Sequence, residues 1–225
     1  MNPLLVVLIL TGASDLPHHD WEQTTPVLQQ WFRARVLGEP ALLRSEHLKD
    51  VHAVIVNYNG PRWGEQAEQA LEEYVRGGGA LVAFHQACYG EFFGMVLENN
   101  RWRAGPTRGW DAWSRMIGAH WEPAKIGHAR RTRFRVEWRD GSPPFVADDE
   151  LYHRLTLHES VRVLAGAISP PELGGTGDWE PLVWMNEYGR GRVWFTTLGH
   201  DRRALEQPGM KEVFTRGLHW AARRE

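Results

Sequence analysis

The chain of 225 residues has a formal net charge of −2, from 26 Lys and Arg residues against 28 Asp and Glu residues. This length suffices to bury a sizeable core in one α/β domain covering residues 1–225. The balanced charge and the lack of a long basic run argue against nucleic-acid binding, one Cys excludes an internal disulfide, and no apolar run is long enough to span a membrane.

The first apolar run, Leu4–Leu10, has no Lys or Arg before it, and Ala13-Ser14-Asp15 is a poor cleavage site. A signal peptide needs a basic start and a small-residue cleavage site. We therefore interpret Leu4–Thr11 as a buried first strand and expect a cytoplasmic protein. The loop that follows contains small and polar residues and ends at Asp20 and Trp21.

Two helices are predicted in the first third of the chain. Thr25-Pro26 is typical of a helix start, with Thr25 as the capping residue and proline in the first helical position. Apolar residues then recur at helical spacing as far as Val36. The second helix covers Glu65–Arg76, and the glycines at Gly77–Gly79 end it.

Three further strands alternate with these helices: a short one in Ala41–Arg44, then His52–Asn57 and Ala80–Phe84. The last two contain uninterrupted apolar runs, which favour strands buried on both faces of a parallel sheet. Alternating strands and helices with right-handed crossovers predict an α/β fold with a doubly wound, mostly parallel sheet.

The second half of the sequence lacks this regular alternation of strands and helices. Glu98–Lys125 is interpreted as an elaborated loop with a helical piece at Trp110–Ile117. We expect antiparallel additions to the sheet after Arg131, and a hairpin around Gly189-Arg190-Gly191. The remaining predicted elements are strands at Thr132–Trp138, Val161–Ala167, Pro181–Tyr188 and Arg192–Leu198, and a final amphipathic helix at Met210–Ala222.

Four polar residues stand at or near predicted strand ends, where α/β sheets bind ligands: Asp20, His85, Glu150 and His200. His85 follows a buried strand and enters a sharp turn with small residues, as in a nucleophile elbow. Asp20 is either a site acid or a capping residue of its loop. Asp148-Asp149-Glu150 either crowds carboxylates for acid–base chemistry or begins a solvated helix.

Aromatic and His residues beside these positions are candidates for substrate binding. The chain has 12 Trp and 11 His residues, and an indole offers a sugar a flat apolar face with one hydrogen-bond donor. For any single Trp, packing is the favoured explanation. The candidate substrate-binding residues are Trp21, Tyr58, His120, Trp121, Tyr152 and His153.

Several catalytic motifs are missing from the sequence. It contains no HExxH, no CxxC and no glycine-rich phosphate or dinucleotide loop. What remains is chemistry by His and carboxylate groups, with or without a divalent metal. The spacing specifies no ligand set, and His85 with His120, His153 or His200 would be the ligands.

Six short segments carry a family resemblance through their order and spacing: Gly77–His85, Gly118-Ala119-His120, Asp149-Glu150-Leu151-Tyr152, Gly189–Val193, Leu198–Asp201 and Leu218–Ala221. Together they resemble the ThuA-like (trehalose utilisation) family over nearly the whole chain. The resemblance implies the flavodoxin-like fold of the class I glutamine amidotransferase-like superfamily. His85 stands where the amidotransferases carry their nucleophilic Cys, and Cys88 follows about one turn later, so the resemblance does not imply glutamine hydrolysis.

The family is associated with trehalose and other disaccharides and is linked with sugar dehydrogenases that make 3-keto sugars. The resemblance therefore implies action on a 3-keto sugar or glycoside, by elimination and hydration, with Glu150 or His85 as the base. Two alternatives stay open: a non-catalytic carbohydrate-binding or assembly module, and an amidotransferase-like hydrolase that uses Cys88. We expect a small sugar as the partner, no nucleic acid or membrane, and a homo-oligomer.

Overall fold

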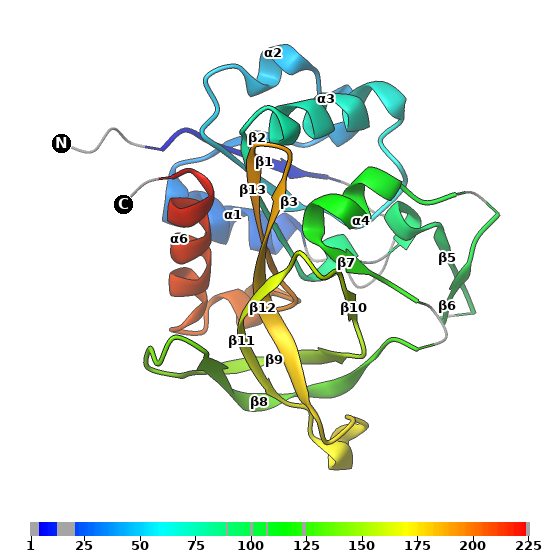
Figure 1. The fold of residues 1–225 in the computed structure, drawn as a ribbon, viewed down its shortest axis with the longest axis vertical. Coiled ribbons are helices and arrows are strands. Elements are labelled where there is room, and N and C mark those ends of the chain that lie inside the picture. Colours follow the sequence, from blue (N-terminus) through cyan, green and yellow to red (C-terminus); the bar gives the residue numbers. More distant parts are fainter. Residues whose placement is uncertain are drawn as a thin grey trace.

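The chain is built around one nine-stranded sheet in the order β2-β1-β3-β4-β13-β12-β11-β8-β9, seen in the ribbon of a computed structural model (Figure 1). The structure describes residues 5–12, 21–88, 90–99, 101–106, 108–122 and 125–223. Because helices cover both faces of this mixed sheet, the protein has the predicted α/β class.

Five neighbouring strands of the sheet run parallel: β2 (Arg35–Leu37), β1 (Val7–Thr11), β3 (Ala53–Asn57), β4 (Ala80–Phe84) and β13 (Gly191–Thr196). Every residue of β1, β3 and β4 is buried, as the uninterrupted apolar runs predict. The carboxyl ends of these strands therefore meet at one edge, and His85 follows β4 at that edge.

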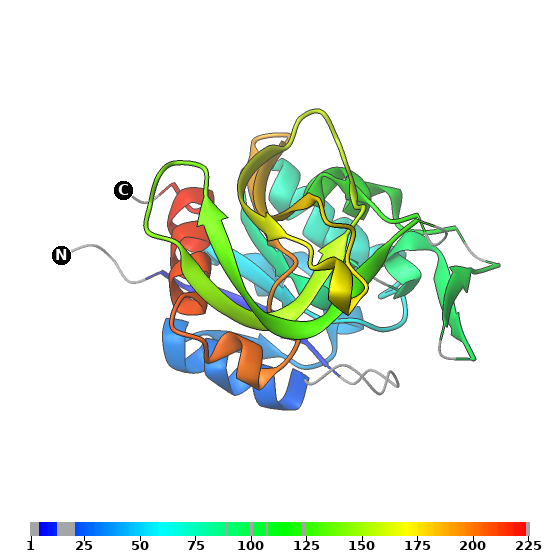
Figure 2. The ribbon, with the colours of Figure 1, turned by 90° about the horizontal axis from the view of Figure 1, so that it is seen from below.

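Four antiparallel strands extend the sheet beyond β13: β12 (Trp179–Tyr188), β11 (Arg162–Ile168), β8 (Gly127–Trp138) and β9 (Phe145–His153). The predicted hairpin is confirmed, because Tyr188 of β12 pairs with Gly191 of β13 in antiparallel register. β8 and β9 curve across one end of the molecule, as the view from below shows (Figure 2).

Two layers of helices cover the sheet. α1 (Trp21–Phe32) and α6 (Met210–Ala221) pack on one face, and α3 (Glu65–Arg76) and α4 (Asp111–Ile117) pack on the other (Figure 1). The short helices are α2 (Ser45–Leu48) and α5 (Arg202–Leu205). Among the described residues, no helix combines the length and apolar character needed to cross a membrane.

The second strand lies earlier than the sequence predicted. Ala41–Arg44 is not a strand, because Pro40–Leu42 forms a 3-10 turn with Pro40 in its first position. The strand at this edge is Arg35–Leu37, which pairs in parallel with β1. The helix predicted from the apolar spacing is also too long at its C-terminal end, because Val36 belongs to this strand and not to α1.

The first helix also begins earlier than predicted, at Trp21, so Pro26 lies within it. Thr25 does not cap this helix. Its hydroxyl group lies 3.1 Å from the hydroxyl of Thr11 and accepts a hydrogen bond from the Asn57 side chain at 2.9 Å. These buried contacts tie α1 to the ends of β1 and β3, so a tertiary network replaces the local cap.

The middle of the chain contains more strand than expected. β5 (Met95–Glu98) and β6 (Arg101–Ala104) form a hairpin, and β7 (Ala119–His120) pairs with β10 (Thr156–Leu157). The helical piece is confirmed as α4. Asp148-Asp149-Glu150 begins no helix, because these residues lie in the middle of β9.

Replacing Gly191 by Ala tests how tightly β13 packs against the end of α3. A Cβ atom at Gly191 would lie 1.9 Å from the backbone oxygen of Val75, and a backbone atom cannot rotate away. We expect Gly191→Ala to lower the free energy of unfolding by about 3 kcal/mol, measured by urea denaturation.

Gly38→Ala is the matched control, because a Cβ atom there would meet nothing within 4 Å. Its free energy of unfolding should stay within about 1 kcal/mol of the wild-type value. Equal stability of the two variants would show that the junction between β13 and α3 is looser than this contact implies.

Candidate functional site

His85 occupies the elbow between β4 and the 3-10 turn His85–Cys88. Its φ angle of 42° lies in the left-handed region, which costs an ordinary residue about 1–2 kcal/mol. Its side chain is buried. A strained backbone at a strand end aims the imidazole over the edge of the sheet, as the sequence predicted for this position, and Cys88 stands only at the end of the same turn.

The two ring nitrogens of His85 have different partners. Nδ1 donates to the backbone oxygen of Thr197 at 2.7 Å, because a carbonyl oxygen only accepts. In the neutral ring Nε2 is then the acceptor, and it lies 3.0 Å from the Tyr152 hydroxyl and 3.0 Å from Nδ1 of His200. The carbonyl of Thr197 thereby fixes the tautomer and turns a lone pair toward these two side chains.

Strand β9 delivers Glu150 and Tyr152 to the same face, because alternate residues of a strand point the same way. The Tyr152 ring stacks on His85, with ring centroids 4.8 Å apart and planes at 28°. Trp121 also packs against Tyr152, with ring centroids 5.7 Å apart and planes at 86°. The Tyr152 hydroxyl is therefore held against His85 by packing as well as by its hydrogen bond.

The loop after β13 places His200 between His85 and Glu150. Nδ1 of His200 lies 3.4 Å from a carboxylate oxygen of Glu150, and the other oxygen of Glu150 lies 3.8 Å from Nδ1 of His128. Behind them, the buried carboxylate of Asp149 accepts from the backbone N–H of Gly199 at 2.6 Å and of Glu150 at 2.8 Å. Asp149 therefore fixes the backbone beside both His200 and Glu150.

Burial and neighbouring charges separate the pKa values of these groups. Burial, aided by the nearby His200, lowers the pKa of His85 to about 3. Burial alone would raise the pKa of Glu150, but the hydrogen bond to His200 and the nearby imidazoles outweigh it and lower that pKa to about 2. Burial opposes a charge on His200, yet the contact with Glu150 prevails and raises its pKa.

At neutral pH, His85 is thus uncharged and Glu150 is ionised, while the contact with Glu150 makes His200 easier to protonate than an ordinary histidine. The site holds two groups that can accept a proton beside one that can donate a proton, all within hydrogen-bonding range. Separated pKa values in adjacent groups are the arrangement that general acid–base catalysis requires.

An ion-pair network around the buried Asp148 holds β9 against the His200 loop. The Arg131 guanidinium donates to a carboxylate oxygen of Asp148 at 2.9 Å and also pairs with Asp201. Asp201 in turn caps α5, because its side chain accepts from the backbone N–H of Ala204. Arg203 pairs with the second oxygen of Asp148 at 2.6 Å. This network fixes the backbone on either side of Glu150 and His200.

The structure brings four of the predicted site residues together: His85, Glu150, Tyr152 and His200. Trp121 borders this group through its contact with Tyr152. Asp20 lies outside the described residues, and Trp21 is the first residue of α1.

Three other predicted binding residues have their described contacts elsewhere. The Tyr58 hydroxyl donates to the backbone oxygen of Pro61, and its ring packs against Trp63 and Phe92. His120 is exposed on β7, with its ring 6.3 Å from that of Phe93. His153 is buried, and its Nδ1 lies 3.4 Å from the hydroxyl of Ser169.

Four supporting residues were absent from the predicted set: His128, Arg131, Asp149 and Thr197. The alternation of β9 separates Asp149 from Glu150, so that spacing could have distinguished the two carboxylates. Thr197 acts through its backbone oxygen, which no side-chain pattern reveals. Arg131 and His128 reach the site only through the pairing of β8 with β9, which contains a register shift between Ala129 and Thr132.

Three side chains of the site can hold a metal ion. One ligand atom from each of His85, Glu150 and His200 lies within 4.8 Å of the other two. Two imidazoles and a carboxylate suit Zn²⁺ and other divalent transition ions. The bond from His85 Nδ1 to a backbone oxygen is the outer contact that orients metal-binding histidines. The residues present therefore fit a divalent ion.

Replacing Arg131 by Met tests the network that holds β9 against the His200 loop. It would leave Asp148, buried on β9, with Arg203 as its remaining described cationic partner. We expect the free energy of unfolding at pH 7 to fall by about 2 kcal/mol, less than for a buried charge that loses every partner. Urea denaturation of Arg131→Met beside Arg133→Met, an exposed residue on the same strand, measures this difference.

The same pair of variants has a predicted pH dependence. Burial would raise the pKa values of Asp148 and Asp201, but their bonds with arginine outweigh it and hold both below the ordinary value of 3.8. A carboxylate with a lowered pKa stabilises the fold above its unfolded pKa, and this stability is lost as the pH falls through the folded pKa. The deficit of Arg131→Met should therefore shrink below pH 4, and an unchanged deficit would contradict the ion-pair assignment.

A family model and several solved structures match this chain. The family model, described as ThuA, trehalose utilisation, matches residues 6–221. A ThuA-like protein from Parabacteroides merdae shares 23% identity with a TM-score of 0.76, covering 97% of this chain and 90% of that one. A ThuA-like protein from Bacteroides uniformis shares 18% identity with a TM-score of 0.71, covering 97% and 91%.

A β-galactosidase from Rahnella sp. R3 shares 17% identity with a TM-score of 0.55, and the match covers 98% of this chain but only 32% of that enzyme. At these identities the solved structures show a shared fold. Among curated proteins, none matches the sequence. Because the family model covers nearly the whole chain, this protein belongs to the ThuA family, the family of trehalose utilisation.

Proposed function

We propose that this protein cleaves a 3-keto glycoside by elimination and hydration. The observation that carries the proposal is the cluster in which Nε2 of His85 lies 3.0 Å from both the Tyr152 hydroxyl and Nδ1 of His200, beside the Glu150 carboxylate. Family membership supports a role in carbohydrate metabolism. We also propose that the five parallel strands form a flavodoxin-like sheet, because their order is β2-β1-β3-β4-β13.

The chemistry needs a base and a stabilised anion. A ketone at C3 of the sugar acidifies the hydrogen on C2, and removal of this proton gives an enolate. The enolate then re-forms the ketone with a C1–C2 double bond while the bond from C1 to the glycosidic oxygen breaks. The departing oxygen takes a proton, and water adds to C1 and C2, so that the net reaction is hydrolysis. Intact acetals need strong acid assistance instead.

The described side chains can divide these tasks. Glu150 is ionised and partly buried, so its carboxylate is the base for the C2 proton. The hydrogen-bond donors Tyr152 and His200 converge on Nε2 of His85, and a keto oxygen that displaced this contact would be stabilised by both as it becomes the enolate. His200, with its raised pKa, then protonates the leaving oxygen.

In this scheme His85 holds the two donors in place before the substrate binds. Its backbone is strained and its Nδ1 is committed to the Thr197 oxygen, so the acceptor Nε2 has one orientation. Preorganised donors of this kind need no rearrangement when charge develops on the substrate.

His85→Ala is expected to lower turnover of a 3-keto disaccharide by on the order of a hundredfold, because the donors lose their shared acceptor. Release of free sugar from matched 3-keto and unoxidised disaccharides measures this change. The wild-type protein should cleave only the keto substrate and introduce solvent deuterium at C2. Equal cleavage of both substrates without deuterium at C2 would refute the mechanism.

Two further variants separate chemistry from folding. Tyr152→Phe keeps the ring that stacks on His85 and removes only the hydroxyl, so it should fold normally and still lose turnover. His219→Ala removes an exposed imidazole on α6 and should keep full activity. Full activity in both His85→Ala and Tyr152→Phe would exclude this site as the place of reaction.

The metal content of the protein distinguishes two versions of this proposal. A divalent ion held by His85, Glu150 and His200 would supply Lewis-acid stabilisation of the enolate oxygen. We expect about one equivalent per chain in protein prepared without chelators, since the three ligands converge, and Glu150→Gln should reduce it by on the order of tenfold. Elemental analysis of the purified protein measures this metal content. Less than about a tenth of an equivalent of metal per chain, together with activity that chelation does not change, would support the metal-free version.

A further inference from the structure

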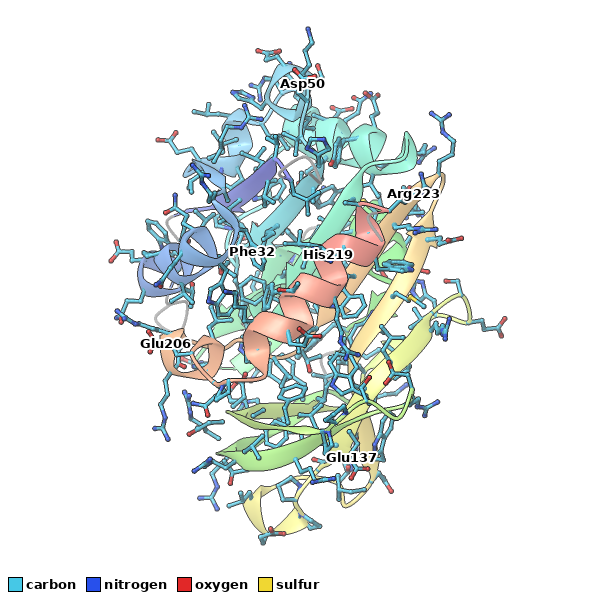
Figure 3. The ribbon with its side chains drawn as sticks, turned by 90° about the vertical axis from the view of Figure 1, so that its left-hand side faces the viewer. Phe32, Asp50, Glu137, Glu206, His219 and Arg223 are labelled. Atoms are coloured by element: carbon cyan, nitrogen blue, oxygen red, sulfur yellow. The ribbon has the colours of Figure 1, made fainter. Side chains whose placement is uncertain are left out.

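A second pocket lies on the sheet face that α6 covers, and its lining shares no residue with the site around His85. Its volume is about 500 Å³, within the range of small-molecule sites. Three neighbouring residues of the sheet form its floor. Trp194 of β13 pairs with Met185 of β12, and Met185 pairs with Arg162 of β11. Figure 3 looks onto α6 and His219, with β13 and β12 beside the helix.

The floor of this pocket contains a buried donor without an acceptor. Trp194 is 3% exposed, and no hydrogen-bond partner for its Nε1 exists among the described residues. Gly217 of α6 packs closely against this edge of the indole, because a Cβ atom there would lie 2.9 Å from Nε1. Buried indole N–H groups usually find a partner, and this unpaired one belongs to a lining residue of the pocket, so its signal reports on a ligand bound against the indole.

The lining carries an excess of positive charge. Arg216 is committed to Asp140, at 3.3 Å, and to Glu212. In the part of the chain that the structure describes, neither Arg139 nor Arg162 has a carboxylate within 4.0 Å, and both line the pocket. The Arg139 guanidinium stacks 4.6 Å from the centre of the Trp179 ring, which leaves its in-plane donors unpaired by that contact. The planar donors of Arg162 and Arg139 match carboxylate, sulfonate and phosphate oxygens.

Aromatic rings provide the rest of the surface. Trp138 and Trp220 line the walls beside Trp194, and the Arg216 guanidinium stacks 4.4 Å from the centre of the Trp138 ring. Flat apolar walls favour a flat apolar ligand. We propose that this pocket binds a small planar organic anion, with its ring among the tryptophans and its charge at Arg162 and Arg139.

The experiment uses 8-anilinonaphthalene-1-sulfonate, which has flat rings and one negative charge, and the uncharged N-phenyl-1-naphthylamine. Titration calorimetry on the full chain should show one saturable site for the sulfonate and binding at least about tenfold weaker for the neutral compound. Arg162→Ala should weaken sulfonate binding by about tenfold, since one charge-assisted bond is lost. Arg133→Ala, an exposed control on β8, should not change it.

Nuclear magnetic resonance tests whether the sulfonate binds beside Trp194. The indole N–H signal that disappears in Trp194→Phe identifies Trp194, and this signal should shift as the sulfonate saturates the wild-type protein. Because Arg162 is exposed, its replacement does not threaten the fold if Trp194→Phe proves unstable. An unmoved Trp194 signal at saturation, equal binding of the two compounds, or wild-type affinity in Arg162→Ala would each overturn the proposal.

Discussion

The hydrogen bond from His85 to the backbone oxygen of Thr197 joins the ends of β4 and β13, and the arrangement of the site depends on it. It fixes which ring nitrogen carries the proton, and so which one faces Tyr152 and His200. It also joins two neighbouring strands at the edge where parallel sheets bind ligands. A left-handed φ at His85 is tolerated here because the surroundings determine the conformation.

The antiparallel half of the sheet supplies the opposite side of the site. β9 brings Glu150 and Tyr152, and the network of Arg131 with Asp148 and Asp201 fixes this strand against the loop that carries His200. Burying the Asp148 carboxylate is costly unless it is paired, and its bonds to Arg131 and Arg203 fix the position of β9. The network keeps an ionised carboxylate beside an imidazole whose pKa is raised, which neither half of the sheet would do alone.

The sequence predicted the parts of this structure that follow from local pattern. The apolar run before His85 and the helix at Glu65–Arg76 were correct, because each repeats one period without interruption. The strand at Arg35–Leu37 was missed because three residues carry too little pattern, and Thr25 was misread because its hydroxyl serves a tertiary network. The supporting roles of Thr197 and Asp149 rest on backbone groups, which residue types do not encode.

The position of β13 has a consequence for how the chain folds during synthesis. This strand lies in the interior of the sheet, between β4 and β12. One edge of β4 therefore stays unpaired while more than a hundred residues are made between Phe84 and Gly191. Such distant pairing slows folding and prolongs the exposure of an apolar edge, which favours aggregation until β13 has been made.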